Sequence, residues 1–143
     1  MMKFRFITPQ DPEYPQELML RWEVLAKPLG LPPGMEEKNE ETKSLHLIAL
    51  DRKKLVGCVL FCPEGEKQGS VREMALSEEY QGRGFGRKLM AMLEHALQER
   101  GIEEIKLLSP PERTGFYERM GYKHAGELVK KSGILWQPMR KTL

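Results

Sequence analysis

The residues with the clearest chemical meaning lie in one stretch, Val71–Arg87, which reads VREMALSEEYQGRGFGR. The apolar run Val71–Leu76 predicts a strand, and apolar residues at helical spacing over Phe85–Leu97 predict a helix. Between them stand three glycines at every second position, which let backbone N–H groups turn toward one point without Cβ obstruction: Gly82, Gly84 and Gly86. The start of a helix adds unpaired N–H donors and a partial positive charge. This stretch therefore predicts a cradle for a diphosphate.

The spacing of the glycines excludes two common phosphate motifs. Counted from Gly82, the second glycine of a GxxxxGK[ST] loop falls on Arg87, and so does the third glycine of a GxGxxG fingerprint. The pattern that remains is Q-x-x-G-x-G. Arg83, Arg87 and Lys88 place formal charge beside it, either for charge-assisted contacts to phosphate or as a solvated helix face.

The segment Gln81-x-x-Gly84-x-Gly86, which follows Arg72-x-Met74-Ala75-Leu76, resembles the (Q/R)xxGx(G/A) loop of the GNAT superfamily of acetyl-CoA-dependent N-acetyltransferases. The resemblance implies acetyl-CoA as cofactor and two groups of binding residues. Backbone groups of one would pair with the pantetheine arm: Met74, Ala75 and Leu76. The other would hold the diphosphate, mainly through main chain: Gln81, Gly82, Arg83, Gly84, Phe85, Gly86 and Arg87. The alternative is a glycine-rich turn that binds nothing.

A second resemblance lies at Phe116-Tyr117-x-x-x-Gly121-Tyr122, which is similar to the FYxxxGF segment of the same family. It implies that the Tyr117 phenol lies near the CoA sulfur. A phenol can protonate the thiolate that leaves when an acyl group is transferred. Tyr117 is therefore the expected general acid. The alternative is a core tyrosine whose hydroxyl meets a backbone partner.

An incoming amine must lose a proton before it attacks, and the expected general base is Glu73 on the strand beside the acyl position. Strand alternation would place Glu73 on the face of Val71 and Ala75, opposite Arg72 and Met74. In that position it could instead pair with a neighbouring strand. His46, with its near-neutral pKa, and a water chain without a single base are the alternatives.

The acceptor is expected to be a primary amine on a small molecule or peptide, attacked directly in a ternary complex with acetyl-CoA. In folds of this family the first helix, the loop after it and the closing strands build the acceptor pocket, which implies Trp22, His46 and Trp136 as substrate-binding residues. Burial in the core is the alternative role for these side chains. A non-catalytic acyl-CoA-binding sensor is the alternative function, because it keeps the phosphate loop and needs neither Tyr117 nor a base.

Composition bounds the class of protein. The 143 residues are predicted to form a single domain, 1–143, with 40% hydrophobic and 31% charged residues. A net charge of +2 with scattered basic residues argues against nucleic acid as a partner, and no apolar run is long enough for a membrane span. The N-terminus lacks the features of a signal peptide, so the cytoplasm is the expected location.

The two cysteines, Cys58 and Cys62, lie four residues apart on one apolar run. On a strand that separation is about 13 Å, beyond the ~7 Å reach of a disulfide. Two buried thiols are therefore expected. A nucleophilic Cys58 is the alternative, although no helix start or adjacent base supports it. No cluster of cysteine and histidine suggests a metal.

The remaining elements follow from hydrophobic periodicity and turn residues. Strands are expected at Lys3–Thr8, Leu45–Leu50, Leu55–Phe61, Ser70–Leu76, Ile102–Leu108, Tyr122–Ala125 and Ile134–Met139. Three helices are expected: Pro15–Ala26, a helix that begins after Gly84, and a helix that begins after a capping box at Ser109–Glu112. The first has Leu18, Trp22 and Leu25 on its apolar stripe, with Arg21 and Glu23 outside it. Met35–Ser44 is expected to be a short helix or an exposed connector.

The order of these elements predicts an α+β fold. Its mixed central sheet has an antiparallel meander, one parallel βαβ crossover from Ser70–Leu76 to Ile102–Leu108, and flanking helices. The GNAT fold has the same order. A homodimer in which Ile134–Met139 pairs across an edge is an open alternative.

Overall fold

The computed structural model describes all residues, Met1–Leu143. One eight-stranded sheet runs through the molecule, in the order β1-β2-β3-β4-β5-β8-β6, with β7 also paired to β8. The strands are β1 (Met2–Ile7), β2 (Leu45–Asp51), β3 (Lys54–Pro63), β4 (Gln68–Leu76), β5 (Glu104–Ser109), β6 (Lys123–His124), β7 (Val129–Lys131) and β8 (Ile134–Thr142). The α-helices are α1 (Tyr14–Arg21), α2 (Lys38–Lys43), α3 (Phe85–Glu99) and α4 (Thr114–Arg119).

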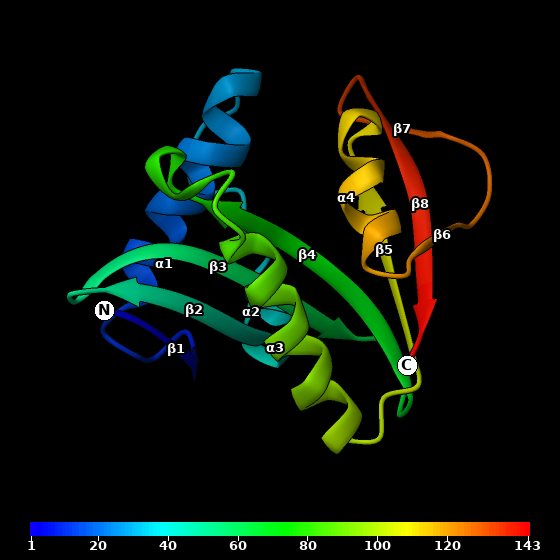
Figure 1. The fold of residues 1–143 in the computed structure, drawn as a ribbon. Helices are drawn as coiled ribbons and strands as arrows, with labels where there is room; N and C mark the ends of the chain where they lie inside the picture. Colours follow the sequence, from blue (N-terminus) through cyan, green and yellow to red (C-terminus); the bar gives the residue numbers. More distant parts are fainter.

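The pairing of the strands confirms the predicted mixed sheet. β1 to β4 form an antiparallel meander, β4 and β5 are the one parallel pair, and β8 closes antiparallel to β5. Helix α3 provides the crossover between the parallel strands. Figure 1 shows α3 on one face of the meander and α1 with α2 on the other. The α+β fold class predicted from the sequence is confirmed.

The core divides into two clusters, one on each face of the sheet. The larger cluster packs α3 against the sheet through side chains that are fully buried: Leu89, Met90, Leu93 and Leu97. The smaller cluster lies under α1 and contains Leu20, Ile48, Cys58 and Ala75. Both cysteines are buried and unbridged, as predicted.

The parallel strands β4 and β5 separate part of the way along their length. They pair only from Gln68–Glu104 to Ser70–Lys106. Beyond Ser70, β4 continues to Leu76 with β3 alone as a neighbour, while β5 continues beside β8. The two strands diverge in Figure 1 from the end near the C-terminus. The backbone of β4 from Val71 to Leu76 therefore presents an open edge toward β5.

The predicted neighbours of Glu73 on its face of β4 are partly wrong, because β4 contains a β-bulge. The register with β3 shifts between Cys58–Ala75 and Leu60–Arg72, and Glu73 has a φ of 55°. A bulged residue adds one position to the strand and breaks the alternation of side chains. Glu73 consequently faces α1, on the same side as Ala75, whereas Val71 joins the α3 cluster.

The predicted capping box at Ser109 is also wrong. Ser109 belongs to β5, is fully buried and donates its hydroxyl to the carbonyl of Pro110. Pro110 is extended, with a ψ of 141°, because a residue that precedes proline is displaced from helical geometry. A 3-10 turn at Pro111–Arg113 follows, and α4 begins at Thr114.

The first helix is shorter than predicted and buries a different face. It ends at Arg21 and continues as a π-helical turn, Trp22–Ala26, and a 3-10 turn, Lys27–Leu29. Its buried residues are Glu17, Leu20 and Arg21, whereas the predicted apolar stripe placed Arg21 outside the core. Glu17 and Arg21 are charged side chains in the core, and the periodicity of apolar residues does not predict such positions.

The C-terminal strand β8 pairs within the chain along its whole length, on one edge or on both. β8 pairs with β5 over Gln137–Thr142 on one edge, and with β6 and β7 on the other. Residues Ile134–Trp136 pair with β7 around a turn at Ser132–Gly133, where both residues have positive φ. None of the helices is both long and apolar enough to cross a bilayer.

Candidate functional site: an amide cradle beside a splayed strand

The phosphate loop ends in a helix start whose N–H groups are free. Gly82 and Gly84 have φ values of 71° and 84°, in the left-handed region that favours glycine, and the space beside each is open. No backbone N–H from Gly82 to Arg87 donates a hydrogen bond within the protein; the first to do so is that of Lys88, to Gly84. No side chain caps α3. Six consecutive donors are therefore available to an external acceptor.

Contacts with the sheet fix this loop in place. The Gln81 amide donates to the carbonyl of Leu76 at 2.9 Å, which ties the loop to the end of β4. The Tyr80 hydroxyl donates to Asp51 at 2.6 Å. Arg83 lies 5.4 Å from the Tyr80 ring and 5.3 Å from the Phe85 ring, in a cation–π arrangement.

The cations around the loop differ in what they contact. Arg83 also donates to the carbonyl of Glu79 at 3.2 Å, so its guanidinium is partly held by the protein. Lys88 lies 5.3 Å from the Phe4 ring. Arg87 is exposed and forms no ion pair. All three cations stand at the positive end of the α3 dipole, where they add to the attraction for an anion.

Gly86 lies where the start of α3 packs against α4, the helix that carries Tyr117. A Cβ at Gly86 would lie 3.1 Å from Met74 and 3.7 Å from Phe116, so glycine lets β4, α3 and α4 approach one another. Met74 and Leu76 pack their side chains against the α3 cluster. Their backbone groups lie on the open edge of β4, next to Ala75.

Tyr117 is buried, yet its hydroxyl has no partner in the protein. Only 7% of the residue is exposed, and its ring packs edge-on against Phe116 and Tyr122 at 5.0 and 5.7 Å. Among buried side-chain polar atoms only Glu13 Oε1 lacks a partner, so the unpartnered Tyr117 hydroxyl must reach solvent. Burial raises the pKa of Tyr117, and the charge of Arg113 opposes this only in part. The phenol therefore keeps its proton through the neutral range and is free to donate it.

Glu73 faces a buried cluster of charges on α1 and α2. Its carboxylate lies 3.7 Å from Arg21 Nε, and 39% of the side chain is exposed. Partial burial raises the pKa of Glu73, and although Arg21 lowers it, Glu41 and Glu17 raise it further. A carboxylate with a raised pKa is better suited to accept a proton near neutral pH. Hydrophobic periodicity does not reveal this cluster, and the i,i+4 spacing of Glu17 and Arg21 is its only local signal in the sequence.

The three residues expected to bind the acceptor have separate environments. His46 has no exposed surface; its Nδ1 is 3.0 Å from Glu17 and its Nε2 is 2.7 Å from the carbonyl of Glu41. The Trp22 indole donates to the carbonyl of Leu31 at 3.0 Å and fastens the loop after α1. Trp136 is half-buried on β8, opposite Val129. In this conformation only the two tryptophans present surface to solvent.

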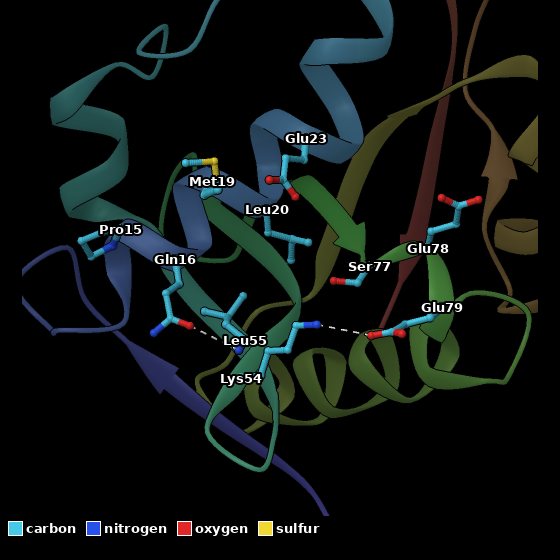
Figure 2. Close-up of a pocket in the computed structure, with 10 residues that line it drawn as sticks. All are labelled: Pro15, Gln16, Met19, Leu20, Glu23, Lys54, Leu55, Ser77, Glu78 and Glu79. Carbon is cyan, nitrogen blue, oxygen red and sulfur yellow. Dashed lines mark hydrogen bonds and ion pairs between the residues drawn. The ribbon is translucent and has the colours of Figure 1, made fainter.

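A shallow groove lies between α1 and the turn that precedes the phosphate loop (Figure 2). Met19, Leu20 and Leu55 provide its apolar surface, and its rim includes Glu23 and a Lys54–Glu79 ion pair at 3.4 Å. None of the predicted catalytic, cofactor-binding or acceptor-binding residues lines this groove. The open edge of β4 and the phosphate loop are therefore the candidate functional site.

Comparisons with known proteins show the family to which the chain belongs. The family model described as "Acetyltransferase (GNAT) domain" matches residues 11–143. The chain belongs to the GNAT acetyltransferase family, which confirms the resemblance found in the sequence. By class it is an acyl-CoA N-acyltransferase.

Solved structures share the fold across nearly the whole chain at low identity. Escherichia coli ElaA superposes with a TM-score of 0.87 at 15% identity, over 99% of each chain. An acyl-CoA N-acyltransferase from Pseudomonas aeruginosa gives 0.84 at 21% identity, over 99% of each chain. An aminoglycoside 6'-N-acetyltransferase complexed with coenzyme A gives 0.80 at 19% identity, over 98% of this chain and 96% of the other.

Proposed function

We propose that residues 1–143 act as one domain that transfers the acetyl group of acetyl-CoA to a primary amine by direct attack. The observation that carries the proposal is the run of six unpartnered N–H groups from Gly82 to Arg87, next to the open edge of β4. Donors arranged at a helix start bind phosphate oxygens. The aminoglycoside 6'-N-acetyltransferase of the same fold, complexed with coenzyme A, supports that choice of cofactor.

The residues present fit coenzyme A in two respects. The open space at Gly82 and Gly84 leaves room for a diphosphate against the backbone, where a Cβ would otherwise point. The free edge of Met74, Ala75 and Leu76 offers backbone donors and acceptors to an amide-containing arm. When bound, acetyl-CoA supplies an acyl group activated as a thioester.

Tyr117 would act as the general acid. Its hydroxyl makes no hydrogen bond in the protein and reaches solvent, and its raised pKa keeps the proton in place. A buried phenol used only for packing would be expected to donate to a backbone carbonyl. The absence of such a partner supports the proton-donor role.

Glu73 would act as the general base for the amine. The bulge turns its carboxylate toward α1, and its partly exposed side chain can reach an acceptor that enters from that side. His46 is a weaker candidate, because both ring nitrogens are already bonded and no part of it is exposed.

The acceptor would be a primary amine on a small molecule or a peptide, with Trp22 and Trp136 as the contact residues of its binding surface. The cytoplasm is the location we propose. A homodimer through Ile134–Met139 would use the edge of Ile134–Trp136 that faces away from β7, because β5 pairs with β8 only from Gln137 onward.

Isothermal titration tests the cofactor assignment. Coenzyme A and acetyl-CoA should bind, and pantetheine, which lacks the diphosphate, should bind far more weakly. No heat with a large excess of coenzyme A would contradict the proposal.

An acetylation assay with a broad panel of primary amines tests the role of Tyr117. Tyr117→Phe should keep coenzyme A affinity and lose about 10²–10⁴ in kcat, the range of general acid catalysis. Tyr122→Phe is the matched control, since its hydroxyl lies in the same aromatic cluster but donates to Glu94 at 2.8 Å. Equal turnover in Tyr117→Phe and the wild type would remove Tyr117 as the acid. Binding without turnover toward any amine would favour the acyl-CoA sensor.

A further inference from the structure

Arg21 lies at the centre of a buried cluster of charges behind the open edge of β4. Its Nη1 is 2.9 Å from Glu17 Oε2 and 2.7 Å from Glu41 Oε1, and its Nη2 is 2.9 Å from Glu41 Oε2. All three residues are at least nine-tenths buried. A guanidinium fork held by two carboxylates in this way has a fixed orientation.

Two further side chains hold those carboxylates. His46 Nδ1 lies 3.0 Å from Glu17, and the Tyr14 hydroxyl donates to Glu41 Oε1 at 2.7 Å. These five side chains come from α1, α2 and β2. Glu17, Glu41 and His46 also have the donor types of a metal site, but the Arg21 cation already binds both carboxylates.

Within this cluster Arg21 Nε has no partner, and it faces Glu73. Arg21 Nε lies 3.7 Å from Glu73 Oε2, across from the β-bulge. The Cys58 thiol donates to the carbonyl of Glu73 at 3.4 Å, which helps to hold the bulge on the other side. The Glu73 carboxylate thus lies beside a guanidinium whose orientation is fixed.

The charges that face Glu73 come from three elements. Glu17 and Arg21 lie on α1, Glu41 lies on α2, and Arg72 precedes Glu73 on β4. Arg72 is engaged by Glu40, at 2.5 Å, and Glu64, at 3.9 Å. Without Arg21, the Glu73 carboxylate would face two carboxylates with only Arg72 to oppose them.

We propose that Arg21 is a positioning residue for the acetyl transfer, holding the Glu73 carboxylate charged and oriented at the open edge of β4. The inference rests on the proposed function, in which Glu73 accepts the proton of the amine. The roles of Glu17, Glu41, Tyr14 and His46 are then to hold Arg21, so that its Nε remains directed at Glu73.

The direct test needs no acceptor. In protein labelled with ¹³C at the glutamate carboxyl carbons and saturated with coenzyme A, the Glu73 resonance is identified by its loss in Glu73→Gln and then titrated. Arg21→Met should raise the titration midpoint by about one pH unit, since a cation near 4 Å from a partly exposed carboxylate contributes about 1 kcal/mol or more. The control Arg140→Met removes an exposed arginine of β8 and should leave the midpoint unchanged.

A second variant guards against loss of the fold in Arg21→Met. Arg21→Lys keeps the positive charge in the cluster but has no Nε–H to direct at Glu73, so the midpoint should rise by less than in Arg21→Met. An unchanged midpoint in Arg21→Met, or in Arg21→Lys if Arg21→Met does not fold, would overturn the inference, as would a fall of the midpoint in either variant.

Turnover separates this inference from the proposed function. If Glu73→Gln loses activity toward the amine panel but the Glu73 midpoint is the same in Arg21→Met, Glu73 remains the proposed base and the role of Arg21 is wrong. If Glu73→Gln is fully active, Glu73 is not the base, and the catalytic role of Arg21 fails with it. If Glu73→Gln is inactive and the Glu73 midpoint depends on Arg21, Arg21→Met should add little further loss of kcat in the Glu73→Gln background.

Discussion

Replacement of Gly84 by alanine should separate the binding of diphosphate from the stability of the fold. Gly84 has a φ of 84°, and a Cβ there would meet no atom within 4 Å. The substitution therefore adds backbone strain of about 1–2 kcal/mol and no clash. Because no side chain caps α3, the free protein can relieve part of that strain by letting the turn rearrange.

Strain relieved in the free protein must be restored when the N–H groups converge on a diphosphate. The loss of stability and the loss of binding free energy should then add up to about 1–2 kcal/mol. If most of it falls on binding, the affinity for coenzyme A drops about 5- to 30-fold. Isothermal titration with coenzyme A and thermal unfolding of the free protein measure the two parts.

Gly101 provides the matched control at the other end of the same helix. Its φ is 82°, and a Cβ there would also meet nothing within 4 Å. Gly101→Ala should lower Tm by about 2–4 °C per kcal/mol of strain, with coenzyme A affinity unchanged. The reasoning would be refuted if the two alanine variants bound coenzyme A equally well, or if Gly101→Ala lost as much affinity as Gly84→Ala.

Two further predictions concern stability. Burial lowers the pKa of His46, but its bonds to Glu17 and to the carbonyl of Glu41 outweigh burial and raise the pKa above 6.5. The contribution of protonated His46 to the stability of the fold is therefore complete below pH 6.5 and is lost as the pH rises through the raised pKa. Tm of the wild type should therefore decrease as the pH rises above 6.5, and the decrease should be smaller in His46→Gln. The same dependence of Tm on pH in both proteins would contradict this prediction. Leu93→Ala removes a fully buried side chain of α3 and should cost about 2–5 kcal/mol in denaturant unfolding, whereas the same change at exposed Leu135 should cost far less.

The fold and the phosphate loop could be predicted from the sequence because their signals are local. Glycines at every second position, a strand before them and apolar residues at helical spacing after them are all contained in Val71–Leu97. The order of turns and apolar runs then left only one arrangement of the parallel crossover. The structure adds that every N–H from Gly82 to Arg87 is free, a property that spacing alone does not establish.

The surroundings of Glu73 could not be predicted, since they depend on a bulge and on residues far apart in the sequence. A single residue with positive φ broke the alternation of side chains, so Val71 lies on the face of the sheet opposite Glu73. Three of the four charges that face Glu73 lie on α1 and α2. Periodicity placed Arg21 outside the core because it depends only on the positions of apolar residues. Burial of Arg21 requires Glu17 and Glu41 together, and the second lies 20 residues further along the chain.

The central claim concerns the contacts of the main chain with a diphosphate, and a crystal structure with coenzyme A bound tests it most directly. We expect diphosphate oxygens within about 2.7–3.2 Å of several backbone nitrogens between Gly82 and Arg87. The pantetheine arm should then lie along Met74–Leu76. A coenzyme A molecule bound elsewhere, with these nitrogens contacting only water or side chains, would contradict the account.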